Sequence, residues 1–297
     1  MMHFLEISQL SRPQIESLLD RALVFKNQKK YPSFPDQTVA QLFYENSTRT
    51  RVSFELAANR LAMPVINLDI ASSSEAKGET IEDSISNLAA MGIQHYVVRH
   101  QENGLQQRLA DNLGNAVHII NAGDGTHAHP SQALLDMMTI LEHKPRLTEL
   151  KIAVVGDIKH SRVANSLQCI CAKLGVGELV LVAPEAWQPE KVHFGRVTSE
   201  LFDGLDEADV VVCLRVQKER LLSEDHLDLD SYRQNFALTA KSLSFAKQDA
   251  MLMHPGPMNR GVEIDSEVAD GPQSVILQQV ENGVYARMAI FESLIKA

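Results

Sequence analysis

Short apolar runs alternate with longer stretches of helical periodicity along most of this chain. The runs lie at residues 39–44, 64–70, 95–98, 117–121, 151–155, 179–183, 210–214 and 250–253. Runs of this length and composition are typical of strands buried on both faces, and strands separated by helices imply parallel sheets. The pattern therefore predicts an α/β fold whose parallel sheets are flanked by helices.

The chain is long enough for two domains, since its 297 residues can form two cores of ordinary size. No strand is predicted at 144–150, a stretch that contains Pro145 and that we interpret as a hinge between the domains. We expect a first domain at 1–143, a second at 144–274, and a last helix over 275–297 that Gly283 interrupts. The apolar face of that helix consists of Val280, Val284, Met288, Phe291 and Leu294.

Composition narrows the class of protein. A hydrophobic content of 44% with 22% charged residues is typical of a globular protein, and the formal net charge of −10 argues against nucleic acid as a partner. No apolar run approaches the length of a membrane span, and residues 1–10 lack a signal-peptide pattern, so we expect a cytoplasmic protein. The cysteines, Cys169, Cys171 and Cys213, lack the spacing of a zinc site and are expected to be buried thiols.

Residues Ser47–Arg51, Ser-Thr-Arg-Thr-Arg, stand between the first predicted strand and a helix. The first N–H groups of a helix have no partner within it, and its dipole favours an anion there. Hydroxyls add donors, and the guanidinium of Arg49 can bind two phosphate oxygens at once. The segment therefore predicts an anion site; the alternative is an ordinary Ser/Thr N-cap with two solvated arginines.

The same five residues resemble the carbamoyl phosphate signature of the aspartate and ornithine carbamoyltransferases. This resemblance implies that the phosphate of that substrate is held by Ser47, Thr48, Arg49 and Thr50. Downstream, the polar segment 72–79 is by itself an ordinary mobile surface loop. It also resembles the loop that reaches a neighbouring subunit's active site in this family. This resemblance implies that Ser73 contacts the phosphate and that Lys77 contacts both substrates. It further implies a homotrimer whose three chains share their active sites.

Two further motifs follow in the first domain. Arg99 ends a predicted strand, where side chains point into the crevice of an open α/β sheet; the alternative is a rim arginine paired with an acid. His127 and His129 lack the third ligand of a metal site, so we expect no metal. By resemblance, Arg99 contacts the phosphate and the carbamoyl oxygen, His129 donates to that oxygen, and Gln132 meets the carbamoyl nitrogen.

The second domain carries its own arginines. Its first turn, Gly156-Asp157, lacks the further glycines of a dinucleotide fingerprint, so no nicotinamide cofactor is expected. Arg162 opens the next helix, and Arg215 ends a strand two residues before Gln217. Two arginines suit a dicarboxylate, although two surface ion pairs would look the same in sequence. In the aspartate branch of the family an Arg-x-Gln stands at this place. This resemblance implies that Arg162, Arg215 and Gln217 bind L-aspartate.

The last motif lies at 254–261, His-Pro-Gly-Pro-Met-Asn-Arg-Gly, where ornithine enzymes carry a different sequence. By resemblance, the backbone carbonyls of Pro255 and Gly256 bind the carbamoyl amino group, and Pro257 completes that segment. Gly256-Pro257 is a candidate cis bond, since such bonds are kept in tight turns.

The resemblance covers nearly the whole chain and implies a carbamoyl transfer from carbamoyl phosphate to L-aspartate in pyrimidine biosynthesis, without a cofactor. It assigns the chemistry to Arg49, Thr50, Lys77, Arg99 and His129. It also implies that helix 275–297 returns to the first domain. Two alternatives stay open: a carbamoyltransferase for another amino acid, and a catalytically silent homologue that serves as an assembly partner. The sequence does not decide whether a trimer joins regulatory or dihydroorotase-like chains.

Overall fold

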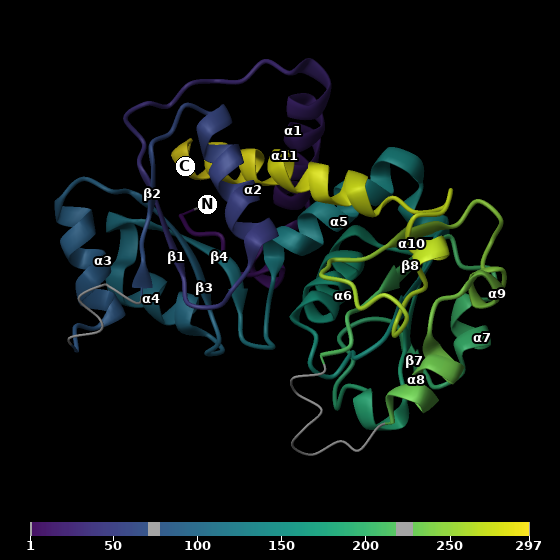
Figure 1. Cartoon of the computed structure of the whole chain (residues 1–297). Helices are drawn as coiled ribbons and strands as arrows, with labels where there is room; N and C mark the ends of the chain where they lie inside the picture. Colours follow the sequence, from purple (N-terminus) through teal and green to yellow (C-terminus); the bar gives the residue numbers. More distant parts are fainter. Residues whose placement is uncertain (1, 71–77, 218–227, 297) are drawn as a thin grey trace. The chain divides into compact units, whose positions relative to one another are not determined.

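The computed structural model describes residues 2–70, 78–217 and 228–296. The chain divides into two compact units, Met1–Met138 with Glu281–Ala297, and Thr139–Val280. Each unit contains one parallel sheet with helices packed on it (Figure 1). The predicted α/β class is therefore confirmed. Within the described residues, no helix combines the length and apolarity needed to cross a bilayer.

The sheet of the first unit has four strands in the order β2-β1-β3-β4, all parallel. They are β1 (Val39–Phe43), β2 (Val65–Asn67), β3 (His95–His100) and β4 (His118–Asp124). All four were predicted, because each contains an apolar run. The register sets Phe43 of β1 beside Arg99 of β3, so the carboxyl ends of these strands form one edge.

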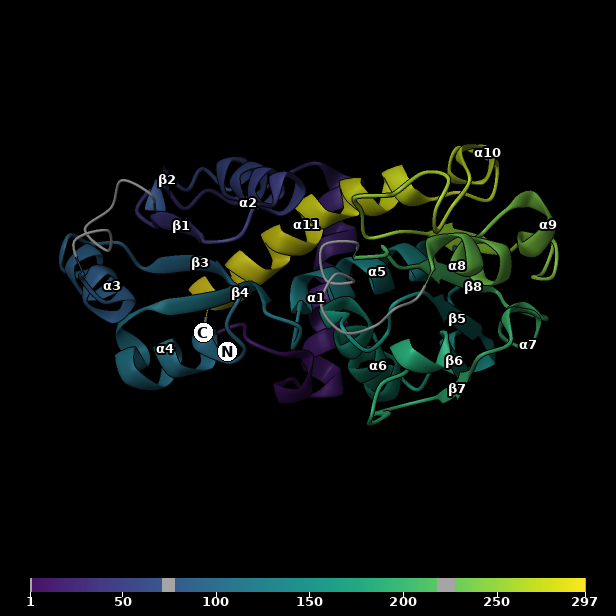
Figure 2. The ribbon, with the colours of Figure 1, turned by 60° about the horizontal axis from the view of Figure 1, so that its bottom comes forward.

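Helices cover both faces of this sheet, as Figure 2 shows for α3 and α4 on one side and α2 and α11 on the other. The helices α1 (Arg12–Gln28), α2 (Thr48–Arg60), α3 (Ile81–Ala90) and α4 (Leu105–Leu113) belong to this unit, as does α5 (Pro130–His143) up to Met138. One core joins Leu42 and Tyr96 of the sheet to Ile85 of α3 and Leu109 of α4. On the opposite face, His95 of β3 lies edge-on to a phenylalanine of α11.

The outer edge of β4 is covered by the N-terminal segment. The N–H of Phe4 donates to Ile119 O at 2.9 Å, and the N–H of Asn121 donates to Phe4 O at 2.8 Å. Phe4 is also fully buried. The segment thus continues the sheet by one parallel bridge, between Phe4 and Ile120.

The second unit has a five-stranded parallel sheet in the order β7-β6-β5-β8-β9. Its strands are β5 (Lys151–Val155), β6 (Glu178–Val182), β7 (Arg196–Thr198), β8 (Val210–Cys213) and β9 (Met251–Met253). Its helices are α6 (Arg162–Leu174), α7 (Leu201–Leu205), α8 (Leu229–Phe236), α9 (Ala240–Leu243) and α10 (Ser266–Ala269). Strand β7 was not predicted. Cys171 and Cys213 are buried thiols as expected, whereas Cys169 is partly exposed.

The last helix, α11 (Ile276–Ile295), runs without a break through Gly283, so the predicted interruption is wrong. A Cβ added at Gly283 would lie 2.5 Å from Arg287 Nη1, which shows that the glycine makes room for a side chain of the next turn. The predicted apolar face is buried except for Val280, which is 41% exposed. From Glu281 onward the helix belongs to the first unit, which confirms that it returns to that unit.

Candidate active site

The loop after β1 places the Ser-Thr-Arg-Thr-Arg segment at the start of α2. Ser47 is the N-cap residue with an extended backbone, yet its side chain makes no capping hydrogen bond. The first N–H groups of α2 therefore receive no side-chain cap from Ser47, and the ordinary N-cap alternative is not supported. Thr50 is buried, whereas Arg49 is exposed. Arg51 also lies on the surface, where its Nε donates to Asn67 Oδ1 at 3.2 Å.

Arg99 lies near the carboxyl end of β3, as predicted, and its side chain is 12% exposed. Its Nε is 3.2 Å from Glu45 Oε2, and its Nη1 donates to Ala122 O at 3.2 Å. The alternative of an arginine paired with an acid is thus partly correct, although Glu45 was not singled out in the sequence. These contacts hold the guanidinium at the carboxyl edge of the sheet, where open α/β sheets bind ligands.

His129 and Gln132 stand at the start of α5 and are almost fully buried. The turn before them is organised by Asp124, whose Oδ1 accepts from the N–H of Ala128 at 2.9 Å and whose Oδ2 accepts from the N–H of Gly104 at 3.0 Å. Because β4 ends at Asp124, this turn lies at the same sheet edge as Arg99. The structure thus brings three sequence motifs to one edge of the first sheet. Ser73 and Lys77 lie outside the described residues.

In the second unit the predicted arginines follow neighbouring strands. The register pairs Val155 of β5 with Cys213 of β8, so Arg162 after β5 and Arg215 after β8 stand at one carboxyl edge. Gln217 joins them, since its Nε2 donates to His160 O at 3.2 Å, two residues before Arg162. The structure therefore supports grouping Arg162, Arg215 and Gln217.

Asp157, to which the sequence pattern assigned no role of its own, fixes that turn. It is 2% exposed, and its Oδ1 accepts from the N–H of His160 at 3.2 Å. Gly156 before it has a φ of +136° and approaches Leu214 so closely that a Cβ would lie 3.0 Å from Leu214 O. This glycine therefore serves close packing between strand ends.

The segment after β9 is held by a buried carboxylate that the sequence did not reveal. Gly256-Pro257 is cis, in agreement with its choice as a candidate. Both oxygens of Glu263 accept from Asn259, one from its N–H and the other from Nδ2 at 3.1 Å. Asn259 Nδ2 also lies 2.9 Å from Val216 O. Glu263 thus ties the loop that carries Pro255, Gly256 and Pro257 to the segment between Arg215 and Gln217.

Replacing Glu263 by glutamine should lower the midpoint of thermal unfolding by about 5 to 10 °C. The NH₂ group of the new amide would face an N–H donor of Asn259 in a buried place, which costs roughly 2 to 3 kcal/mol. The same change should weaken whatever ligand Arg215 and Gln217 bind. Calorimetric unfolding measures the first effect. Glu267→Gln, which changes an exposed carboxylate four residues further along the chain, is the control, and equal midpoints for the two variants would contradict the role of Glu263.

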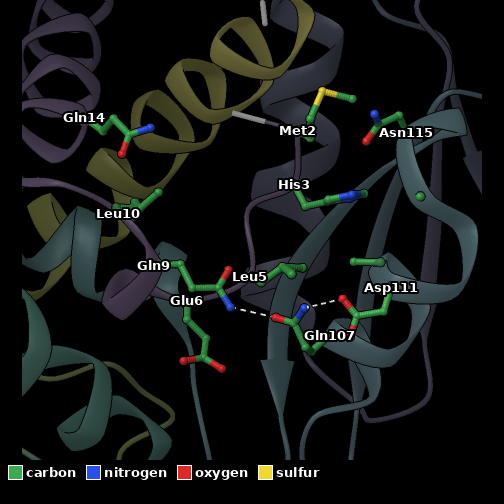
Figure 3. A pocket seen from close by; sticks show the side chains of 12 residues that line it. Met2, His3, Leu5, Glu6, Gln9, Leu10, Gln14, Gln107, Asp111 and Asn115 are labelled. Carbon is green, nitrogen blue, oxygen red and sulfur yellow. Dashed lines mark hydrogen bonds between the residues drawn. The ribbon is translucent and has the colours of Figure 1, made fainter.

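A separate hollow of about 360 Å³ lies in the first unit between the N-terminal segment and α4 (Figure 3). Three of its polar side chains form a chain of hydrogen bonds: Gln9 Nε2 donates to Gln107 Oε1 at 2.7 Å, and Gln107 Nε2 donates to Asp111 Oδ1 at 2.8 Å. None of the residues predicted from the motifs lines it. The sheet edges are therefore the stronger candidate for the site.

Comparisons with known proteins identify the family of the chain. Residues 2–142 match the family model for the aspartate/ornithine carbamoyltransferase carbamoyl-P binding domain, and residues 148–294 match the model for the Asp/Orn binding domain. The two matched segments together span nearly the whole chain.

Individual relatives match over nearly their full length. The aspartate carbamoyltransferase catalytic subunit of Legionella pneumophila strain Lens is 74% identical over 295 residues, which cover 99% of each chain. The protein of that description from Coxiella burnetii strain RSA 493 is 48% identical, covering 98% of this chain and 95% of the relative. The structure of aspartate transcarbamoylase from Trypanosoma cruzi in complex with carbamoyl aspartate and phosphate aligns with a TM-score of 0.89 at 29% identity, covering 98% of this chain and 95% of that one. This chain belongs to the aspartate/ornithine carbamoyltransferase family.

Proposed function

We propose that this chain catalyses carbamoyl transfer from carbamoyl phosphate to L-aspartate, giving N-carbamoyl-L-aspartate and phosphate for pyrimidine biosynthesis. The observation that carries the proposal is 74% identity, over 99% of both chains, to a catalytic subunit of that activity. The grouping of Arg162, Arg215 and Gln217 at one sheet edge supports the choice of a dicarboxylate acceptor.

In this proposal the first unit binds carbamoyl phosphate. The phosphate accepts hydrogen bonds from the start of α2 and from Ser47, Thr48, Arg49 and Thr50. Arg99 and His129 donate to the carbamoyl oxygen, and Gln132 together with the carbonyls of Pro255 and Gly256, before Pro257, accepts from the carbamoyl amino group. Donors fixed before the substrate binds stabilise developing charge effectively, because they need little reorganisation.

The reaction is a direct displacement. The amine of aspartate attacks the carbamoyl carbon, a C–N bond forms, and negative charge develops on the carbonyl oxygen near Arg99 and His129. The C–O bond to phosphate then breaks, and the phosphate leaves with its electron pair near Arg49. The amine loses one proton, which the departing phosphate accepts. The protein contributes charge stabilisation and orientation of the two substrates, and no covalent enzyme intermediate is required.

An assay of purified protein with carbamoyl phosphate and either L-aspartate or L-ornithine tests the proposal. We expect carbamoyl aspartate and an equal amount of phosphate, with ornithine at least about a hundredfold less efficient, because a side-chain ammonium cannot pair with two arginines. Turnover with ornithine instead would favour the other branch of the family. Inactivity with both amino acids would favour a silent homologue.

We also propose that three copies form a closed cyclic trimer in the cytoplasm, in which Ser73 and Lys77 of one chain serve the site of the next. The support is the resemblance of segment 72–79 to the loop that crosses between subunits in this family. These two residues lie outside the described part of the chain.

Mixing two inactive variants tests this sharing of sites. Arg49→Ala and Lys77→Ala should each be nearly inactive, yet a site that takes Arg49 from one chain and Lys77 from another can be intact in a mixed trimer. Random exchange makes about three quarters of the trimers mixed, so roughly a quarter of all sites should recover. The measurement is activity after joint dissociation and reassembly. Mixed trimers as inactive as their parents would show that Lys77 acts within its own chain.

A further inference from the structure

A buried charged pair stands behind Gln132 in the first unit. Gln132 Nε2 donates to Asp136 Oδ1 at 2.8 Å, one turn further along α5. Asp136 is fully buried, and the nearby guanidinium of Arg287, from α11, is 3% exposed. Burial lowers the pKa of Arg287 to about 9, while the Asp136 charge opposes that shift, so Arg287 remains a cation at neutral pH.

The surroundings of Arg287 fix its position. Its Nη1 donates to Gly283 O at 2.9 Å, its Nη2 lies 3.4 Å from Ser131 Oγ, and its Cζ lies 4.8 Å from the centre of the Phe54 ring. Ser131 belongs to the start of α5, and Phe54 to α2. One guanidinium therefore contacts both helices that begin at the proposed carbamoyl phosphate site.

We propose that Asp136 and Arg287 are positioning residues that fix the amide of Gln132 with its oxygen toward the substrate. The inference rests on the proposed function and deepens it. An ionised carboxylate can only accept hydrogen bonds, so it selects the NH₂ end of the amide. The Oε1 end is then left for the ligand, where it accepts from the amino group of carbamoyl phosphate. Arg287 favours the ionised form of Asp136, because an opposite charge nearby stabilises a buried carboxylate.

This arrangement has a consequence for substrate choice. Acetyl phosphate has the size and the phosphate of carbamoyl phosphate but carries a methyl group where the substrate has NH₂. An oriented amide oxygen gains a hydrogen bond only from the NH₂ group, and the methyl group leaves that buried acceptor without one. The ratio of the two dissociation constants therefore measures the orientation of Gln132, whereas general damage to the site would weaken both ligands together.

The experiment measures both dissociation constants by calorimetry for the full chain and for three variants. Gln132→Met removes the amide of residue 132. Asp136→Asn leaves that amide in place but no longer fixes its orientation, because the new side chain at position 136 can either accept or donate a hydrogen bond. The third variant combines both changes. We expect the preference for carbamoyl phosphate to fall about tenfold in each single variant, the amount expected for one hydrogen bond. The combined variant should fall no further than Gln132→Met alone, because the two residues act through the same bond.

Glu142→Gln is the matched control, since it makes the same chemical change further along α5 and should keep the full preference. If Asp136→Asn does not fold, Asp136→Leu with Arg287→Met removes both buried charges, a replacement that is often tolerated. It should lose the preference equally. An unchanged preference in either folded variant, or an added loss in the Gln132→Met background, would overturn the inference. The proposed function fails separately, if the unaltered chain forms no carbamoyl aspartate.

Discussion

Replacing Arg49 by alanine should lower kcat/KM for carbamoyl phosphate by about a hundred- to a thousandfold. A charge-assisted donor aimed at a leaving phosphate is worth roughly 3 to 4 kcal/mol in the transition state. Arg49 is exposed in the first turn of α2, so its loss should change the free energy of unfolding by less than about 0.5 kcal/mol. Steady-state kinetics at saturating aspartate, together with thermal unfolding, separates the two effects.

Arg51→Ala is the matched control, because Arg51 lies two residues further along the same turn, is also exposed, and contacts Asn67. It should reduce kcat/KM by no more than a few-fold. Similar losses for the two variants would mean that α2 presents a general positive surface, and the specific role of Arg49 would then be wrong.

Replacing Arg215 by alanine should raise the Michaelis constant for aspartate by about thirty- to a thousandfold while carbamoyl phosphate affinity changes only a few-fold. A desolvated bidentate pair between a guanidinium and a carboxylate contributes roughly 2 to 4 kcal/mol. Arg215 follows β8 in the second unit, whereas the residues proposed to bind the phosphate belong to the first. The two constants are measured by varying one substrate while the other is saturating.

Arg196→Ala controls for the general effect of removing an arginine from the second unit. Arg196 is exposed and pairs with Glu178 and Asp203, so its loss should leave both Michaelis constants within about twofold. Equal weakening of both substrates by Arg215→Ala would show that this arginine supports the whole site and does not select the acceptor.

Much of the fold could be predicted because buried parallel strands leave continuous apolar runs. Apart from Lys151, the central strands β5 and β8 consist of apolar residues and one cysteine. A short run of this kind is typical of a strand buried on both faces. The same logic placed Arg99 and Arg215 at strand ends. Parallel strands of one sheet point their carboxyl ends to the same edge, so residues that follow different strands of that sheet become neighbours.

Other elements could not be predicted for physical reasons. Strand β7, Arg196–Thr198, is three residues long and lies at the sheet edge, where one partner strand holds it without an apolar run. Gly283 was expected to interrupt α11 because glycine weakens helices. Its role depends on Arg287, whose guanidinium occupies the space above it. The helix propensity of glycine describes that residue by itself and does not include the effect of a neighbouring side chain such as Arg287.

The buried charges were the larger omission. In sequence, Asp136, Glu263 and Arg287 look like solvated residues, since charged side chains are seldom fully buried. Each is buried because a specific partner from a distant or neighbouring segment offsets its desolvation, and one sequence does not record that partnership. The motif residues that contact substrate in the proposal could be named, whereas the residues that hold them could not.

The pairing of Phe4 with β4 covers the outer edge of that strand, and it should guard against strand-to-strand aggregation. With residues 2–5 deleted, β4 would become an edge strand that presents unpaired N–H and C=O groups beside the buried side chains of Ile119 and Ile120. Exposed apolar edges recruit other strands and lead to aggregation. The few residues ahead of α1 therefore act as a cover whose loss would first appear as reduced solubility of the chain.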